Sequence, residues 1–68
     1  MLTTEQTQII LEKIEALRGL EGIKALRRNN AIFKFLNNLN ANGFIDSEEY
    51  RRLDTLRYEA FIKIRREN

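Results

Sequence analysis

The chain of 68 residues contains no cysteine and no histidine. Without cysteine it can form neither disulfides nor thiolate–metal sites. Without histidine, a His-dependent catalytic triad, a histidine general base and the usual zinc sites are excluded. A domain this short buries only roughly 60% of the surface that its unfolded chain exposes, so it is marginally stable without further support. With disulfides and ordinary zinc sites excluded, we expect self-association to supply that support.

Proline is also absent, and the glycines are few: Gly19, Gly22 and Gly43. This scarcity of turn-forming residues favours long helices over strands joined by β-turns. The longest aliphatic run, residues 9–11, is far too short to span a membrane. Because the first residues also lack a basic segment followed by an apolar one, we expect a cytoplasmic protein with no membrane association.

Apolar periodicity and helix-capping residues predict an all-α fold in one small domain, residues 1–68. The expected helices cover roughly residues 4–18, 22–42 and 47–66. Thr3 and Gln6 form a Thr-x-x-Gln capping box at the start of the first helix. Gly19 and Gly22 weaken helix continuity, so we expect a bend or short loop between the first two helices. A single long helix that continues to Asn42 is the alternative.

Each expected helix has an apolar side that predicts the core. The expected core residues are Ile9, Ile10, Ile14, Leu17 and Leu20 in the first helix, Leu26, Ile32, Phe33, Phe35, Leu36 and Leu39 in the second, and Tyr50, Leu53, Leu56, Ala60, Phe61 and Ile64 in the third. The apolar side of the second helix covers roughly half of its circumference. We therefore expect this helix to be packed by both neighbours, or by one neighbour and a partner chain, and the three-helix unit to dimerise into a helical bundle.

The loop after the second helix has the clearest local signal. Gly43 is expected in the left-handed conformation past the helix end, with Phe44 packing back on Leu39 in a Schellman motif. Asp46 is expected to cap the third helix, with Glu49 at its third position. These features predict a tight helix–loop–helix hairpin. The run Gly-x-Ile-x-x-Glu-Glu-aromatic is similar to the hairpin motif of short bacterial SHOCT-type domains, but capping alone generates that pattern, so we assign no family.

Residues 38–49 also resemble the twelve-residue calcium loop of EF-hand proteins, with Gly43 at position 6 and Glu49 at position 12. The resemblance implies the calcium ligands Asn38, Asn40, Asn42, Asp46 and Glu49. The three early ligands are amides instead of carboxylates, and capping explains the same loop without an ion, so we expect no metal site. A degenerate calcium loop is the remote alternative. It would end the second helix near Asn38, whereas a capped hairpin ends it near Asn42.

The charges are unevenly distributed. Residues 1–21 carry four glutamates against Lys13 and Arg18, a balance of −2, whereas residues 22–45 carry four bases and no acid, a balance of +4. The four bases are Lys24, Arg27, Arg28 and Lys34. Lysine and arginine neutralise phosphates, so this face predicts nucleic-acid binding as one alternative. Four charges give only weak, salt-sensitive binding by a monomer, and the face is otherwise solvated or meets the acidic first helix of its own or a partner chain.

Two polar residues interrupt the apolar sides of the expected helices. Asn29 lies in the second helix, where a single polar residue often fixes the register between helices. Arg57 lies in the third, where an arginine is not fully buried unless it is paired. Tyr58 and Ile62 follow beside the core, next to Arg65. We predict a partner-binding patch of Arg57, Tyr58, Ile62 and Arg65, with a wide core or a dimer seam as the alternative.

Catalysis is not expected. The adjacent carboxylates Glu48 and Glu49 fall in the first turn of a helix, where they stabilise the macrodipole. The chain has no glycine-rich phosphate loop and is too short to enclose an ordinary pocket, so we expect no cofactor and no small-molecule substrate. The expected function is protein binding by a small homodimeric regulator, an adaptor or inhibitor of a larger protein partner, of the kind that bacteria, phages and mobile elements encode. A small nucleic-acid-binding regulator is the alternative.

Overall fold

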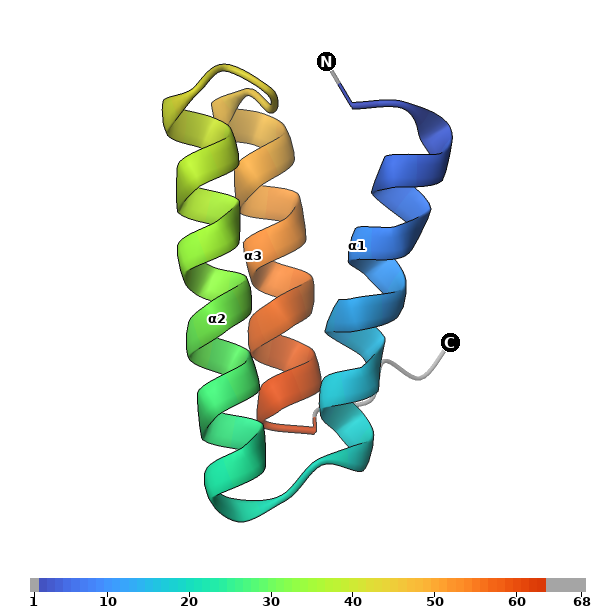
Figure 1. Cartoon of the computed structure of the whole chain (residues 1–68), viewed down its shortest axis with the longest axis vertical. Helices are drawn as coiled ribbons and strands as arrows, with labels where there is room; N and C mark the ends of the chain where they lie inside the picture. The colour runs from blue at the N-terminus through green and yellow to red at the C-terminus, as the bar shows by residue number, and fades with distance from the viewer. Residues whose placement is uncertain (1, 64–68) are drawn as a thin grey trace.

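The computed structural model describes residues 2–63 and consists of three α-helices and one short 3₁₀ turn, with no strand in that part of the chain (Figure 1). The elements are α1 (Thr4–Ala16), the 3₁₀ turn η1 (Leu17–Gly19), α2 (Gly22–Ala41) and α3 (Ser47–Phe61). The predicted all-α unit of an N-terminal helix and a helix–loop–helix hairpin is therefore confirmed.

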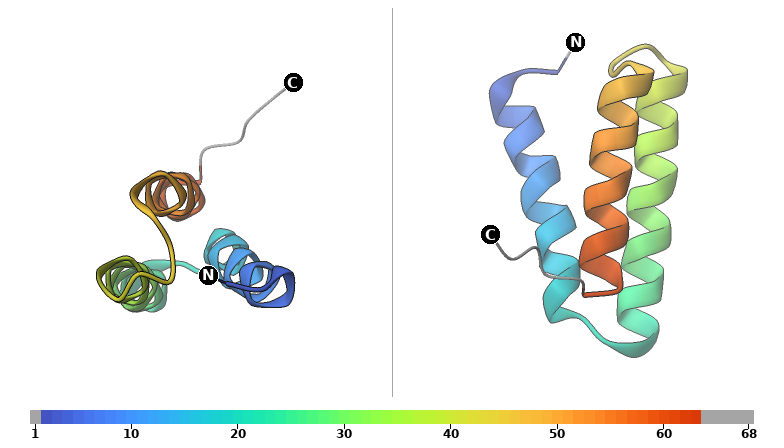
Figure 2. Two further views of the ribbon diagram at one scale, coloured as in Figure 1. Left: turned by 90° about the horizontal axis from the view of Figure 1, so that it is seen from above. Right: turned by 180° about the vertical axis from the view of Figure 1, so that it is seen from behind.

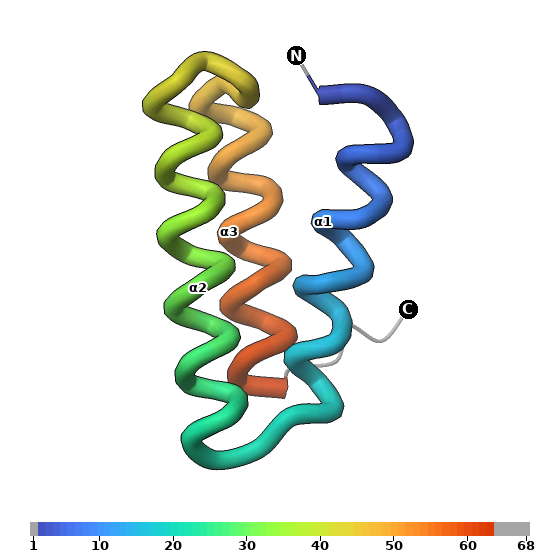
Figure 3. Tube along the Cα trace, viewed as in Figure 1, coloured from blue at the N-terminus to red at the C-terminus, as the bar shows by residue number. Residues whose placement is uncertain are grey.

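The helix α3 is the central element. It packs against α2 along the hairpin and against both α1 and η1, whereas α1 hardly touches α2. Viewed from above, the three helices stand at the corners of a triangle (Figure 2). The Cα trace shows that α1 approaches the hairpin near η1 and diverges from it toward the N-terminus (Figure 3). The expectation that the second helix is packed by both neighbours is thus wrong for the single chain, because the tilt of α1 leaves one side of α2 uncovered.

The start of α1 is fixed by the predicted capping box. The backbone N–H of Gln6 donates to Thr3 Oγ1 at 3.0 Å, and the backbone N–H of Thr3 donates to Gln6 Oε1 at 2.9 Å. Two N–H groups that the helix itself leaves unpaired are satisfied in this way.

The first two helices are separate. After α1 the chain tightens into η1, and Leu20 then adopts an extended conformation with ψ 151°. Gly22 has φ +62°, in the left-handed region that glycine enters without the steric cost of a Cβ atom. The alternative of one long helix is therefore wrong, and the last residue expected in the first helix, Arg18, lies in η1 instead.

The end of α2 is a Schellman motif, as predicted. Gly43 has φ +77°, the N–H of Phe44 donates to the Leu39 carbonyl at 2.9 Å, and the N–H of Gly43 donates to the Asn40 carbonyl at 3.2 Å. The helix continues through Ala41, which is the end that the capped hairpin predicts and not the end near residue 38 that a calcium loop requires.

The start of α3 is capped by Asp46, whose Oδ1 accepts a hydrogen bond from the Glu49 N–H at 2.8 Å. At its other end α3 stops at Phe61, and Lys63 has φ +61°. The expectation that this helix continues to Arg66 is therefore wrong, although residues 64–66 themselves lie outside the described part. The Lys63 Nζ instead lies 3.4 Å from Glu21 Oε1, beside the connection between η1 and α2.

The core runs along the line where the helices meet. Its buried residues are Ile10, Ile14, Leu17, Ile32, Leu36, Ile45, Leu53 and Ala60. Full burial of a side chain of this size contributes about 1.5–3 kcal/mol, so this cluster dominates the stability of the fold. Four residues expected in the core are exposed instead, namely Ile9, Leu26, Phe33 and Phe35. A three-helix unit with a tilted α1 has no element to cover them. Five others, Leu20, Leu39, Tyr50, Leu56 and Phe61, are partly buried and pack against the core, and Ile64 lies outside the described part.

Candidate partner-binding surfaces

Arg57 lies inside the α2–α3 hairpin. The residue is only 9% exposed, and its guanidinium donates to Asn29 Oδ1 on α2 and to Asp54 Oδ1 on its own helix, the latter at 2.8 Å. The two polar residues that interrupt the apolar sides of α2 and α3 therefore satisfy each other, as buried polar groups must. Arg57, predicted as part of a partner-binding patch, is therefore mostly buried and paired within the chain. The register role expected for Asn29 agrees with the contact.

Arg57 also supports an exposed aromatic ring. Its Cζ atom lies 5.2 Å from the centroid of the Phe33 ring, a cation–π arrangement. Phe33 nevertheless remains 42% exposed. Because one side of the ring is held by a buried and hydrogen-bonded guanidinium, the rest of the ring is presented to solvent from a fixed position.

Exposed apolar residues line the junction of α2 and α3 around Phe33. Leu26 lies two turns before Phe33 on the same side of α2. On α3, Tyr58 follows Arg57 directly, and Ile62 lies one turn further along, as the C-cap of the helix. We call Leu26, Phe33, Tyr58 and Ile62 the seam patch; each is exposed by two-fifths or more. The predicted residue Tyr58 is therefore exposed next to Arg57, the residue that holds Phe33, whereas the predicted Arg65 lies outside the described residues.

Polar and charged residues lie along α3 beside the seam patch. The hydroxyl of Tyr50 donates to Asn37 Oδ1 at 2.9 Å and closes the junction near the loop. The carboxylate of Asp54 is already paired with Arg57. Arg51, one turn before Asp54 on the solvent side, is exposed and forms no ion pair within residues 2–63. Arg51 also lines an open depression between α1 and α3.

A groove separates α1 from α2 near the hairpin loop. It has a volume of about 560 Å³ and is mainly apolar. Its lining residues are Leu2, Thr3, Gln6, Ile9, Ile10, Lys13, Phe35, Leu39 and Phe44. The largest exposed side chains in it are Ile9, Phe35 and Phe44, which are 52%, 46% and 50% exposed. Phe44 thus lines this groove together with Leu39, the residue on which the Schellman motif was expected to pack it. We call this surface the α1–α2 groove.

A larger open depression of about 1020 Å³ lies between the start of α1 and the start of α3. It contains the ion pair of Glu49 and Arg52, with Arg52 Nη2 2.6 Å from Glu49 Oε1. The hydrogen bond from Arg52 lowers the pKa of Glu49, and the same bond raises the pKa of Arg52. Glu49 therefore pairs with Arg52 instead of closing a second capping box, and it stays ionised near neutral pH. This depression is less suited to an apolar ligand than the α1–α2 groove.

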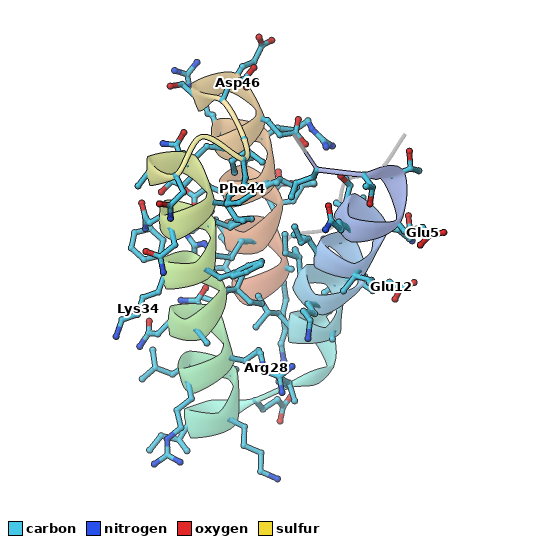
Figure 4. The ribbon with its side chains drawn as sticks, turned by 45° about the horizontal axis from the view of Figure 1, so that its top comes forward. Glu5, Glu12, Arg28, Lys34, Phe44 and Asp46 are labelled. Carbon is cyan, nitrogen blue, oxygen red and sulfur yellow. The ribbon has the colours of Figure 1, made fainter. Side chains whose placement is uncertain are left out.

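The four basic residues predicted for nucleic-acid binding are Lys24, Arg27, Arg28 and Lys34, and all are exposed. They form no ion pair within the described part of the chain. Figure 4 shows Lys34 on the outer side of α2 and Arg28 extending toward α1. At 100° per residue the two lie about 120° apart around the helix, so the four cations form a broad band and not one narrow face.

No group of three or more carboxylate, histidine or cysteine side chains among residues 2–63 is arranged to hold a metal ion. No helix in that part is long and apolar enough to cross a membrane. In the calcium-loop alternative Asp46 and Glu49 would supply the charged ligands, but they are engaged with the backbone of α3 and with Arg52.

The sequence interpretation missed the α1–α2 groove because it assigned Ile9 and Phe35 to the core. One signal was present: the apolar side of the second helix is wider than a single neighbouring helix can cover. Comparison of the chain with protein-family models, curated proteins and solved structures finds no match.

Proposed function

We propose that the protein is a cytoplasmic, non-enzymatic protein-binding module that docks an acidic amphipathic helix of a larger protein on the seam patch. The observation that supports this most directly is that Phe33 remains 42% exposed while the buried and hydrogen-bonded Arg57 holds one side of its ring. Exposed aromatic residues held in fixed positions are the usual anchors of protein interfaces, because little side-chain entropy is lost when they bind.

The charge of the surface suggests the chemistry of the partner. Arg27 and Lys34 lie on the exposed side of α2 and form no ion pair within residues 2–63. A helix with apolar residues at positions i, i+3 and i+7 and acidic residues at its edges complements such a surface. By binding a helix of its partner in this way, the protein would act as an adaptor or an inhibitor.

The experiment is a selection from a displayed library of amphipathic helices about five turns long, with acidic and basic residues allowed equally at the edges. We expect the enriched peptides to be acidic. In fluorescence anisotropy, Tyr58→Ala should weaken their binding by about tenfold or more, as truncation of an interface anchor does. The matched control is Ile23→Ala, which removes an exposed apolar side chain from α2 outside the seam patch. Enrichment of basic peptides, or equal binding by both variants, would overturn the proposal.

A second candidate function is nucleic-acid binding by a small regulator through Lys24, Arg27, Arg28 and Lys34. Its support is that these four exposed cations have no ion pair within residues 2–63. Anisotropy of labelled duplex DNA and single-stranded RNA at about 50 and 200 mM salt tests it. Micromolar binding that collapses at the higher salt and is lost in Arg27→Gln/Lys34→Gln would favour this candidate. Absence of binding at both salt concentrations would remove it.

A further inference from the structure

The α1–α2 groove is an apolar surface between two helices that no helix of the described chain covers. In a compact bundle each helix is covered on the side that its apolar residues occupy. Here α1 packs on α3 and hardly touches α2, and Ile9 and Phe35 face the space between them while remaining about half exposed. Exposed apolar surface of this kind on a small protein marks an interaction site.

We infer that this face is a homodimer interface, in which α1 of each copy lies against α2 of the other. The argument is charge complementarity between the two outer edges of the face. Glu5 and Glu12 lie on the outer side of α1, and Lys34 lies on the outer side of α2 at the opposite edge (Figure 4). Arg27 lies within about 20° of Lys34 around α2. One edge is therefore acidic and the other basic.

A two-fold axis parallel to the helices joins unlike edges. Rotation about such an axis brings the acidic edge of α1 beside the basic edge of α2 in the second copy, and the symmetry repeats the contact on the other side. The same rotation faces the two grooves toward each other and covers Ile9, Phe35 and Phe44 of both copies. A different protein would need an acidic and a basic edge at matching positions, whereas a second copy of this chain already carries both.

The size of the chain favours the same occupant. A domain of 68 residues without disulfides is marginally stable, and a dimer removes further apolar surface from water. The interface leaves the seam patch free, because Phe33 and Phe35 lie about 160° apart around α2. The inference uses apolar residues other than those of the seam patch but shares Arg27 and Lys34 with the proposed function, so the comparison of Phe35→Glu with Tyr58→Glu below distinguishes failure of one from failure of the other.

The first test is sedimentation equilibrium of the full chain over a range of concentrations. We expect a dimer for the wild type and an increase of about tenfold or more in its dissociation constant for Phe35→Glu, because the new carboxylate is buried at the interface without a partner. The matched control Tyr58→Glu places the same charge on the seam patch and should leave the dimer unchanged. A wild-type monomer at all concentrations, or equal effects of both variants, would overturn the inference.

The second test needs no change in any apolar residue, so it holds even if Phe35→Glu impairs folding. The acid variant is Glu12→Lys, and the base variant is Lys34→Glu, because Ile9, Lys13 and Phe35, which neighbour these two residues in sequence, line the same part of the groove. Each alone should dimerise more weakly, since like charges then meet across both edges. An equimolar mixture should restore a dimer as stable as the wild type, because both contacts again join opposite charges. Dimerisation of each variant alone at the wild-type level would refute the arrangement.

Discussion

The buried guanidinium of Arg57 donates a hydrogen bond to Asn29 across the interface of α2 and α3. Each residue interrupts an otherwise apolar helix side, and the two interruptions coincide in space. A shift of either helix by one turn would leave both groups buried without their partner, and an unpaired buried polar group costs about 1–3 kcal/mol. The pair therefore selects one register of the hairpin.

The Asn29–Arg57 contact predicts a non-additive mutational effect. Asn29→Leu should lower the free energy of unfolding by about 1–3 kcal/mol, because guanidinium donors then remain buried without that acceptor. The double variant Asn29→Leu/Arg57→Leu should recover much of this loss, since apolar residues often replace a buried polar pair at little cost. Denaturant unfolding followed by circular dichroism measures both. Strictly additive losses would show that the two residues act independently.

The left-handed conformation of Gly43 in the hairpin loop can be tested by substitution, with Gly19 of η1 as the matched control. Gly43→Ala should destabilise the protein by about 1 kcal/mol, because a Cβ is strained at φ +77° although no other atom stands in its way. A Cβ at Gly19 also meets no atom within 4 Å, and its φ is not positive. Gly19→Ala should therefore be neutral or stabilise by about 0.4–1 kcal/mol. Thermal unfolding of both variants checks this, and equal effects would contradict the Schellman geometry.

The ion pair of Glu49 and Arg52 predicts a pH dependence of stability. The pKa of Glu49 is lowered in the folded protein by its hydrogen bond with Arg52, so the stabilisation is present above the ordinary value of 4.5. It is lost as the pH falls from about 4.5 through the folded-state pKa. Thermal unfolding at pH values on both sides of this window should show a smaller dependence for Arg52→Ala than for the wild type. An unchanged profile would show that the pair is not maintained in solution.

The capping box predicts a local effect on α1. Thr3→Ala removes the oxygen that accepts from the Gln6 N–H and should destabilise the protein by about 0.5–2 kcal/mol. Amide hydrogen exchange should be accelerated most in the first turn of α1, and in α3, whose cap at Asp46 is intact, only by as much as the global stability falls. Equal acceleration in the first turn of α1 and in α3 would contradict a local cap.

Much of the fold could be predicted because its determinants are local. A capping box, a left-handed glycine and an aspartate N-cap each depend on hydrogen bonds between residues three to five positions apart, so the sequence order alone brings the partners together. The three helices and the tight hairpin follow from these signals and from apolar periodicity. The end of α3 was placed too late, at Arg66 instead of Phe61, because the sequence after Phe61 has no glycine or proline to mark it.

The candidate surfaces depended on tertiary structure. Periodicity identifies the side of a helix that is apolar, but not how much of that side a neighbouring helix covers, because coverage depends on the angle at which the helices pack. The tilt of α1 decided that Ile10 is buried while Ile9 and Phe35 line an open groove. Asn29 and Arg57 were each recognised as unusual from the sequence. Only the hairpin, which joins positions 28 residues apart, could decide that they are partners of each other.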